Sequence, residues 1–206
     1  MLIICHRVNK IADLKGTPRE FGVEIDIRGY GKKLLLNHDV INYPEEYDEL
    51  ENYLKEFNHA FIIFNIKEAG IEQQVINLAE KYKIKNYFLL DVEFPYFFRA
   101  TRKDNFRKIA VRYSEAEPIE FTIAQTINGK AIVDWVWVDT NTQLPLNKEI
   151  YNKLKNAGFK LCLVCPERWG RAEDIENYIN YMKENNIELD AVMTALKFAE
   201  KWKSYL

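Results

Sequence analysis

The sequence lacks an excess of charge of either sign. It has 29 lysines and arginines against 31 aspartates and glutamates, a formal net charge of -2 and a pI of about 6.0. The basic residues are scattered among acidic ones and form no stripe. Because nucleic-acid binding depends on clustered lysine and arginine, we expect no nucleic-acid partner.

Long apolar runs are also missing. No run approaches the roughly 20 residues that cross a bilayer, so we expect no membrane span. The N-terminal segment Met1–Arg7 becomes polar too early for a secretory signal. The three cysteines are odd in number and lack the spacing of a disulfide framework. Cys162 and Cys165 lie in an apolar run, where alternation places their sulfurs on opposite faces. We therefore expect buried, reduced thiols and a cytoplasmic protein, rather than a redox pair or a zinc site.

Short apolar runs alternate with amphipathic stretches along the whole chain, without a linker, a low-complexity segment or a repeat. The length predicts a single domain over residues 1–206. The predicted strands are Leu2–Cys5, Gly22–Ile27, Lys33–Leu36, Ala60–Ile66, Tyr87–Leu90, Ile109–Val111, Ile132–Val138, Phe159–Val164 and Leu189–Met193. The predicted helices are Glu45–Phe57, Ile71–Tyr82, Leu146–Ala157 (with Gly158 as its stop), Ala172–Glu184 and Ala195–Tyr205.

Alternating strands and helices indicate parallel strands joined by crossover helices. With residues 22–36 counted as one strand and a short extension, there are eight such units. Eight units favour an α/β fold of the closed (β/α)8 TIM-barrel type. An open doubly wound sheet is the alternative, but it is expected to carry a glycine-rich phosphate turn after its first strand. That position holds His6-Arg7-Val8-Asn9, without a glycine.

Glu24 and Asp26 are the clearest chemical signal, since residues two apart on a strand point to one face. Two carboxylates in a semi-buried site repel each other unless one is protonated or a cation lies between them. Oxygen ligands of this kind suit Mg²⁺, Ca²⁺ or Mn²⁺. The alternative is an outward-facing pair on an edge strand, solvated or paired with Arg28. The spacing alone leaves both interpretations open.

His6 and His38 each follow an apolar strand directly, as polar residues do at many other strand ends of this sequence. The carboxyl ends of strands are where barrel chemistry collects. His38 is followed by Asp39, and a histidine beside a carboxylate can serve as an oriented acid or base. A purely structural role is the alternative for each. His59 lies at a helix–strand junction and is interpreted as structural.

Taken together, His6-Arg7, Glu24-x-Asp26 and His38-Asp39 resemble the signature of the glycerophosphodiester phosphodiesterases. The resemblance extends to Asn65-Ile66-Lys67 and covers essentially the whole chain. It implies a phospholipase-C-like TIM barrel in which Glu24 and Asp26 ligate a divalent cation, Mg²⁺ or Ca²⁺. It further implies that His6 and His38 form the acid–base pair and that Arg7 and Lys67 neutralise the phosphate. The implied substrate is a small phosphodiester of glycerol, a sugar or another polyol.

Several positions depart from the family pattern. Val8 stands where the family has glycine, and Asn65 replaces the third acidic ligand. Asn65 can offer a carbonyl oxygen but no charge, and Glu115 and Glu93 are the candidate substitutes. The insertion after His38-Asp39 is almost absent, and Thr194-Ala195 stands where Thr-Asp is common. The segments 65–70 and 166–171 resemble those of barrels encoded with surface-polysaccharide genes.

Two other functions remain open at this point. One is a non-catalytic or differently employed barrel that binds a phosphorylated sugar or a lipid head group. The other is a lyase that uses the substrate's own hydroxyl as nucleophile, as the related phosphoinositide phospholipases do. Both histidines favour the enzyme, whereas the missing acidic ligand favours the binder. The sequence predicts that His6, Glu24, Asp26, His38 and Lys67 meet at one mouth of the barrel, and it leaves the oligomeric state open.

Overall fold

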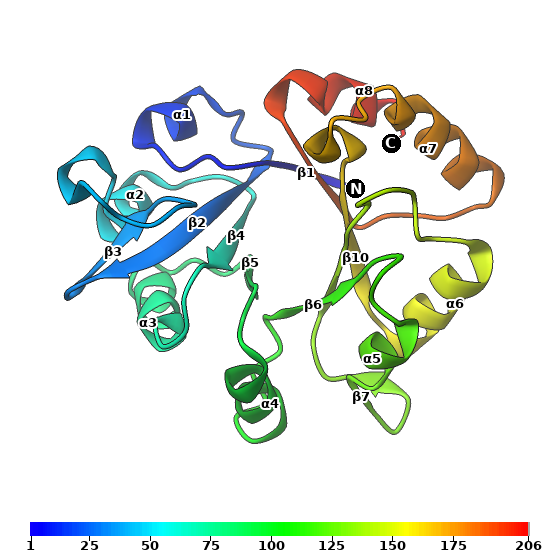
Figure 1. The fold of residues 1–206 in the computed structure, drawn as a ribbon, viewed down its shortest axis with the longest axis horizontal. Helices are drawn as coiled ribbons and strands as arrows, with labels where there is room; N and C mark the ends of the chain where they lie inside the picture. Colours follow the sequence, from blue (N-terminus) through cyan, green and yellow to red (C-terminus); the bar gives the residue numbers. More distant parts are fainter. Residues whose placement is uncertain (206) are drawn as a thin grey trace. The chain divides into compact units, whose positions relative to one another are not determined.

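The computed structural model describes residues 1–205, which fall into two compact units. One unit contains residues 4–97, and the other contains residues 1–3 together with the chain from residue 98 onward. Strand β1 (Leu2–Cys5) begins in the second of these and ends in the first. The ribbon in Figure 1 labels the elements of both.

The unit of residues 4–97 contains parallel strands in the order β5-β4-β2-β1. Its strands are β2 (Gly22–Tyr30), β3 (Lys33–Leu36), β4 (Phe61–Ile66) and β5 (Tyr87–Leu90). Its helices are α1 (Ile11–Gly16), the 3-10 turn η1 (Pro44–Glu46), α2 (Leu50–Glu56) and α3 (Glu72–Lys81). The short strand β3 pairs antiparallel with the end of β2 and extends it (Figure 1).

Strand β2 positions the candidate site, and its sequence explains how. Val23, Ile25 and Ile27 are fully buried on one face of the strand, while Glu24 and Asp26 alternate onto the other. A Cβ atom on Gly22 would lie 3.0 Å from the Phe61 Cβ and 3.1 Å from the Phe61 carbonyl oxygen. Glycine therefore lets β2 approach β4 closely at the point where their parallel pairing begins.

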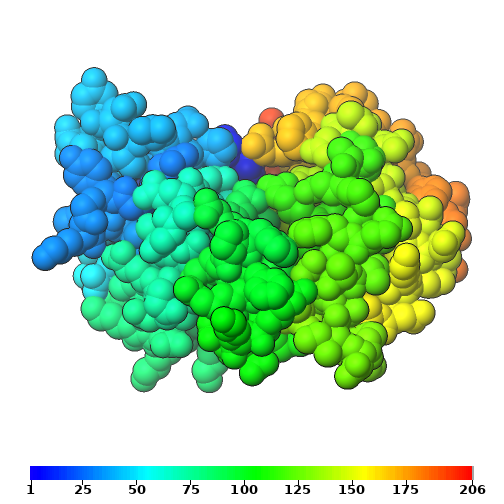
Figure 2. Space-filling model, turned by 60° about the horizontal axis from the view of Figure 1, so that its bottom comes forward, coloured from blue at the N-terminus to red at the C-terminus, as the bar shows by residue number. Residues whose placement is uncertain are grey.

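The other unit contains parallel strands β6 (Ala110–Tyr113), β9 (Trp135–Val138), β10 (Lys160–Val164) and β11 (Ala191–Thr194), plus the hairpin β7 (Thr126–Ile127) and β8 (Lys130–Ala131). The strand order is β1-β11-β10-β9-β6. Its helical segments are α5 (Ile119–Ile123), α6 (Lys148–Ala157), η2 (Pro166–Trp169), α7 (Asp174–Glu184), η3 (Leu196–Phe198) and α8 (Ala199–Lys203). Helix α4 (Phe94–Arg102) runs from the first unit into this one and lies at the surface in Figure 2. Its Phe94 and Phe98 side chains are exposed.

Most predicted strands form within a few residues of their expected bounds, and the predicted strand Ile132–Val138 begins only at Trp135. Gly158 ends α6 with a φ of 90°, as expected for a helix stop. The predicted helix Glu45–Phe57 is wrong in its first half. Asp48 and Glu49 pair with β3 instead, where the Leu36 amide donates to the Asp48 carbonyl at 2.9 Å. The predicted helix Ala195–Tyr205 is divided into η3 and α8, and the short helices α1, α4 and α5 were not predicted.

The three cysteines are buried and reduced, as the sequence predicts. Cys5, Cys162 and Cys165 are all buried free thiols, and burial raises the pKa of Cys165 to about 12. The Trp202 indole donates a hydrogen bond to the Cys165 sulfur at 3.1 Å. In residues 1–205 there is no helix with the length and apolar character needed to cross a membrane.

Candidate active site

The two carboxylates of β2 are almost completely buried, with exposures of 1% for Glu24 and 0% for Asp26. The outward-facing edge-strand interpretation is therefore wrong. The reason is topological, since β2 lies between β1 and β4 and is not an edge strand. Arg28, the partner considered in that interpretation, donates hydrogen bonds to the carbonyls of His38 and Lys67 instead.

Glu24 accepts a hydrogen bond at each oxygen. The Asn65 amide donates to Oε1 at 2.8 Å, and the Arg7 backbone N–H donates to Oε2 at 2.8 Å. The Arg7 φ of 54° belongs to the turn that follows β1. The His6 Nε2 lies 3.9 Å from the same Oε2. Burial, and after it the charge of the neighbouring Asp26, raises the pKa of Glu24 to about 7, against the opposing effect of these hydrogen bonds and of Lys67.

Asp26 is held by an amide and faced by two cations. Asn9 donates its side-chain N–H to Asp26 Oδ2 at 3.0 Å and accepts the Asp26 backbone N–H at 2.8 Å. The Lys67 ammonium lies 3.2 Å from Asp26 Oδ1 and 3.6 Å from Asp91 Oδ2. The Arg7 guanidinium lies 3.8 Å from Asp26 Oδ2.

Two buried oxygens of this site accept no hydrogen bond from the part of the chain that is described. They are Asp26 Oδ1, which has only the ion-pair contact with Lys67, and Asn65 Oδ1. Asp26 and Asn65 are register partners on the neighbouring strands β2 and β4. A buried oxygen without a donor is unusual in a folded protein and is suited to a cation.

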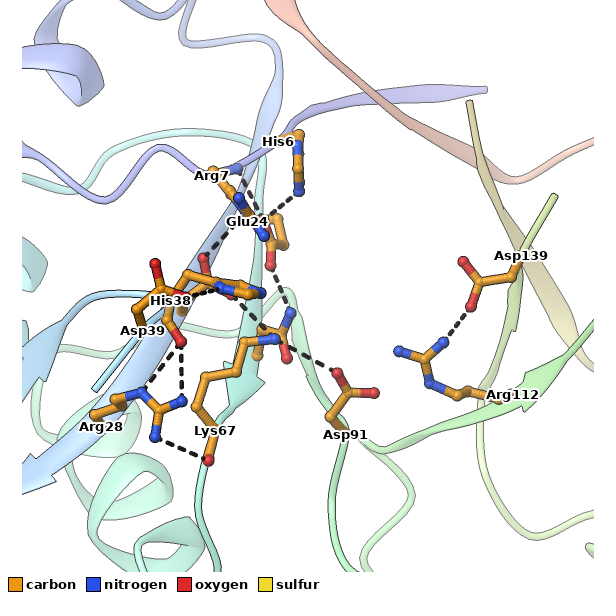
Figure 3. Close-up of polar contacts among 12 residues, drawn as sticks. His6, Arg7, Glu24, Arg28, His38, Asp39, Lys67, Asp91, Arg112 and Asp139 are labelled. Carbon is orange, nitrogen blue, oxygen red and sulfur yellow. Dashed lines mark hydrogen bonds and ion pairs between the residues drawn. The ribbon is translucent and has the colours of Figure 1, made fainter. Parts of the chain in front are cut away.

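His38 follows β3, and its ring Nδ1 lies 2.8 Å from the Asp39 carboxylate. This hydrogen bond lowers the pKa of Asp39. The His38 main chain is tied to the rest of the site, because the Arg28 guanidinium donates to the carbonyls of both His38 and Lys67. Figure 3 shows His38 on the same side of β2 as Lys67 and Glu24.

The structure thus brings most of the predicted residues together within one unit. Figure 3 labels His6, Arg7, Glu24, His38 and Lys67. Asp26 and Asn65 join them through their contacts with Lys67 and Glu24. Glu115 belongs to the other unit, where its Oε1 accepts hydrogen bonds from the backbone and hydroxyl of Thr142. Glu93 is exposed, and Asp91 rather than Glu93 approaches Lys67. Within the other unit, Arg112 forms an ion pair with Asp139.

Asn9 and Asp91 also belong to the site, although neither was predicted from the sequence as a site residue. Asp91 follows β5 directly, so its place at a strand end was an available signal. Asn9 lies in the turn after β1, and only the path of that turn brings it to Asp26.

Among the described residues, no group of three or more histidine, cysteine, aspartate and glutamate side chains is arranged to hold a metal ion. The site therefore offers two carboxylates, supplemented by the neutral carbonyl oxygen of Asn65. This set has less charge than the three acidic ligands of the family pattern.

No protein-family model matches the sequence, and no curated protein matches it. Several solved structures, however, match the fold of this chain. The glycerophosphodiester phosphodiesterase of Thermotoga maritima has a TM-score of 0.65 at 15% identity, over 94% of this chain and 94% of that one. That of Agrobacterium tumefaciens strain C58 has a TM-score of 0.66 at 12% identity, over 99% of each chain.

The chain has the fold of a glycerophosphodiester phosphodiesterase. The predicted TIM barrel is thereby confirmed, with eight parallel strands in the described residues and β3 as the antiparallel extension of β2. At these identities the likeness concerns the fold, and any activity must be argued from the residues of the site.

Proposed function

We propose that this protein hydrolyses a small phosphodiester with the help of a divalent cation. The observation that carries the proposal is the buried pair of carboxylates on β2, which is faced by His6 and by the Lys67 ammonium. Carboxylates, histidine and cations in one site are the groups that phosphoryl chemistry needs. The substrate class is a diester of glycerol, a sugar or another polyol, as the family resemblance implies.

The residues present fit a hard divalent cation. Glu24, Asp26 and the carbonyl oxygen of Asn65 would hold it, since all three offer oxygen and two of these oxygens lack a hydrogen-bond donor. Mg²⁺ and Ca²⁺ are the ions of choice for such ligands. When bound, the cation supplies Lewis-acid polarisation of the phosphoryl oxygens.

The histidines supply the proton transfers. His6 is close enough to Glu24 to be oriented by it, and its side chain is 19% exposed. The hydrogen bond that His38 Nδ1 donates to the Asp39 carboxylate fixes that ring and leaves Nε2 for the substrate. One histidine removes a proton from the attacking water and the other protonates the leaving alkoxide. Arg7 and Lys67 neutralise charge on the phosphate.

Turnover measurements test this proposal. His6→Ala and His38→Ala should each lower turnover by about 100-fold or more, the usual contribution of a positioned acid or base. Wild type and variants are assayed on a panel of glycerol and sugar phosphodiesters with Mg²⁺, Ca²⁺ or a chelator. His59→Gln is the matched control, because the His59 ring bonds to the Thr17 carbonyl in a structural position, and its turnover should be unchanged. Normal rates in both alanine variants would refute the mechanism.

A second candidate is a barrel that binds a phosphorylated sugar or lipid head group without turnover. It is supported by the Asn65 amide on Glu24 and the Lys67 ammonium on Asp26, which satisfy the carboxylates without a third acidic ligand. Binding of a phosphorylated ligand without product formation would favour this candidate. Appearance of a cyclic phosphate would instead indicate the lyase route. Cytoplasmic localisation remains a prediction from the sequence.

A further inference from the structure

Arg28 occupies a distinctive place on β2. It lies two residues after Asp26 and four after Glu24, so alternation directs its side chain to the same face as both carboxylates. It also lies beyond the parallel pairing with β4, in the segment where β2 pairs with β3. From there it reaches the chain that leaves β3 and the chain that leaves β4.

The guanidinium of Arg28 connects these two chains. Its Nε and Nη2 donate to the His38 carbonyl at 3.1 and 2.9 Å, and its Nη1 donates to the Lys67 carbonyl at 3.4 Å. Because the guanidinium is planar and rigid, bonds made from both of its sides fix the two acceptors relative to each other. The side chain of Arg28 is 19% exposed, so it is also constrained by packing.

Glu68 and Gly29 hold Arg28 in this orientation. The Arg28 Nη1 lies 3.7 Å from Glu68 Oε2, while Glu68 Oε1 accepts the Gly29 backbone N–H at 2.7 Å. A Cβ atom at position 29 would lie 2.5 Å from Glu68 Oε1. Glycine at this position therefore permits the carboxylate to reach the main chain of β2 and to face the guanidinium.

We propose that Arg28 is a positioning residue that sets His38 and Lys67 relative to each other, with Glu68 orienting Arg28. The carbonyls that it binds belong to the two residues to which the mechanism assigns a proton transfer and the neutralisation of phosphate charge. Arg28 holds the main chain of His38, whose side chain is 39% exposed, while the hydrogen bond to Asp39 holds its ring. The kinetic consequence rests on the proposed function, whereas the geometric consequence does not.

The kinetic test uses Arg28→Lys, which keeps the charge but replaces the rigid fork by one flexible ammonium that cannot hold both carbonyls in the same way. We expect kcat to fall about 10- to 100-fold, the range in which a misplaced catalytic group affects a rate. KM should change less. The His38 carbonyl receives two of the three bonds and the bond to the Lys67 carbonyl is the longest, so Lys67, which is assigned to the phosphate, depends less on Arg28. Glu68→Gln keeps an acceptor for Gly29 and should produce a smaller loss of kcat.

Arg107→Lys is the matched control. Arg107 also donates to a backbone carbonyl, that of Ala131 at 2.7 Å, and to the carboxylate of Asp134 at 2.8 Å, but it lies in the other unit. Its kcat should equal that of the wild type. An equal loss of kcat in Arg107→Lys would show a general effect of arginine removal and would overturn the inference.

A second readout is independent of turnover. The chain has three histidines, so the imidazole signals of His6, His38 and His59 can be resolved by NMR. Arg28→Lys should shift the His38 signals and leave those of His59 in place, and because the charge is kept, the shift reports a change of geometry. If the wild type turns over no phosphodiester but this shift occurs, the proposed function fails and the positioning role stands. If Arg28→Lys does not fold, Glu68→Gln decides by the same measurement. Unchanged His38 signals and unchanged kcat in a folded variant would overturn the inference.

Discussion

Glu24 allows a sharp test of the site's electrostatics, because its pKa of about 7 in the folded protein exceeds its ordinary value of 4.5. The folded state therefore binds this proton more tightly than the unfolded state does. The resulting stabilisation is fully present below pH 4.5 and is lost as the pH rises through 7. The gap between the two pKa values corresponds to about 3 kcal/mol of free energy of unfolding.

Glu24→Gln should remove this pH dependence. The glutamine is neutral and of the same size, and its carbonyl oxygen can accept the Arg7 N–H. Its amide can face Asn65, which has an unpartnered oxygen to turn toward it. In metal-free protein, the stability difference between variant and wild type should therefore shift in favour of the variant by about 3 kcal/mol between pH 4.5 and pH 8.

The assay is urea denaturation of wild type and variant at intervals across this pH range, with a chelator present. Glu45→Gln is the matched control, because Glu45 is exposed and its replacement should give a difference that does not depend on pH. A pH-independent difference for Glu24→Gln would refute the argument that burial beside Asp26 controls the ionisation of Glu24.

Two further predictions concern neighbours of the carboxylates. Asn65→Glu supplies the third charge of the family pattern, so calorimetric titration at one pH should show tighter binding of Mg²⁺ or Ca²⁺ than in the wild type; equal or weaker binding would mean that residue 65 does not face the metal. Tyr53→Phe removes the hydroxyl that donates to the Val8 carbonyl at 2.8 Å in a fully buried position, so urea denaturation should show a loss of about 1–3 kcal/mol. A loss near zero would contradict the role of that bond in holding the turn after β1.

The sequence carried enough information to predict the barrel and the placement of its main residues on strands. Alternation in Val23-Glu24-Ile25-Asp26-Ile27 predicted that both carboxylates share a face, and the structure agrees. It did not predict whether β2 is an edge strand, because that depends on β1 and β4 pairing with its two edges. Strand order is a tertiary property that periodicity within one strand does not contain.

At the positions where the structure differs from the sequence-based predictions, contacts between distant segments outweigh local preference. The segment before α2 has a helical sequence pattern, yet its backbone does not form a helix up to α2. The Asp48 carbonyl accepts a hydrogen bond from β3 instead. Glu93 was, with Glu115, a candidate substitute for the third acidic ligand. The chain turns at Asp91, whose φ is 59°, and Asp91 is the residue that approaches Lys67. Such turns depend on the packing of the whole unit and have no periodic signal.

The left-handed backbone conformation of Arg7 affects which substitutions would stabilise the turn after β1. At a φ of 54°, an arginine is less stable than a glycine would be, by about 1 kcal/mol. A glycine would still present its N–H to Glu24, but it would remove the guanidinium that faces Asp26. Stability and the proposed neutralisation of phosphate charge thus oppose each other at this single position. Substitutions selected only for a higher melting temperature would be expected to remove the cation first.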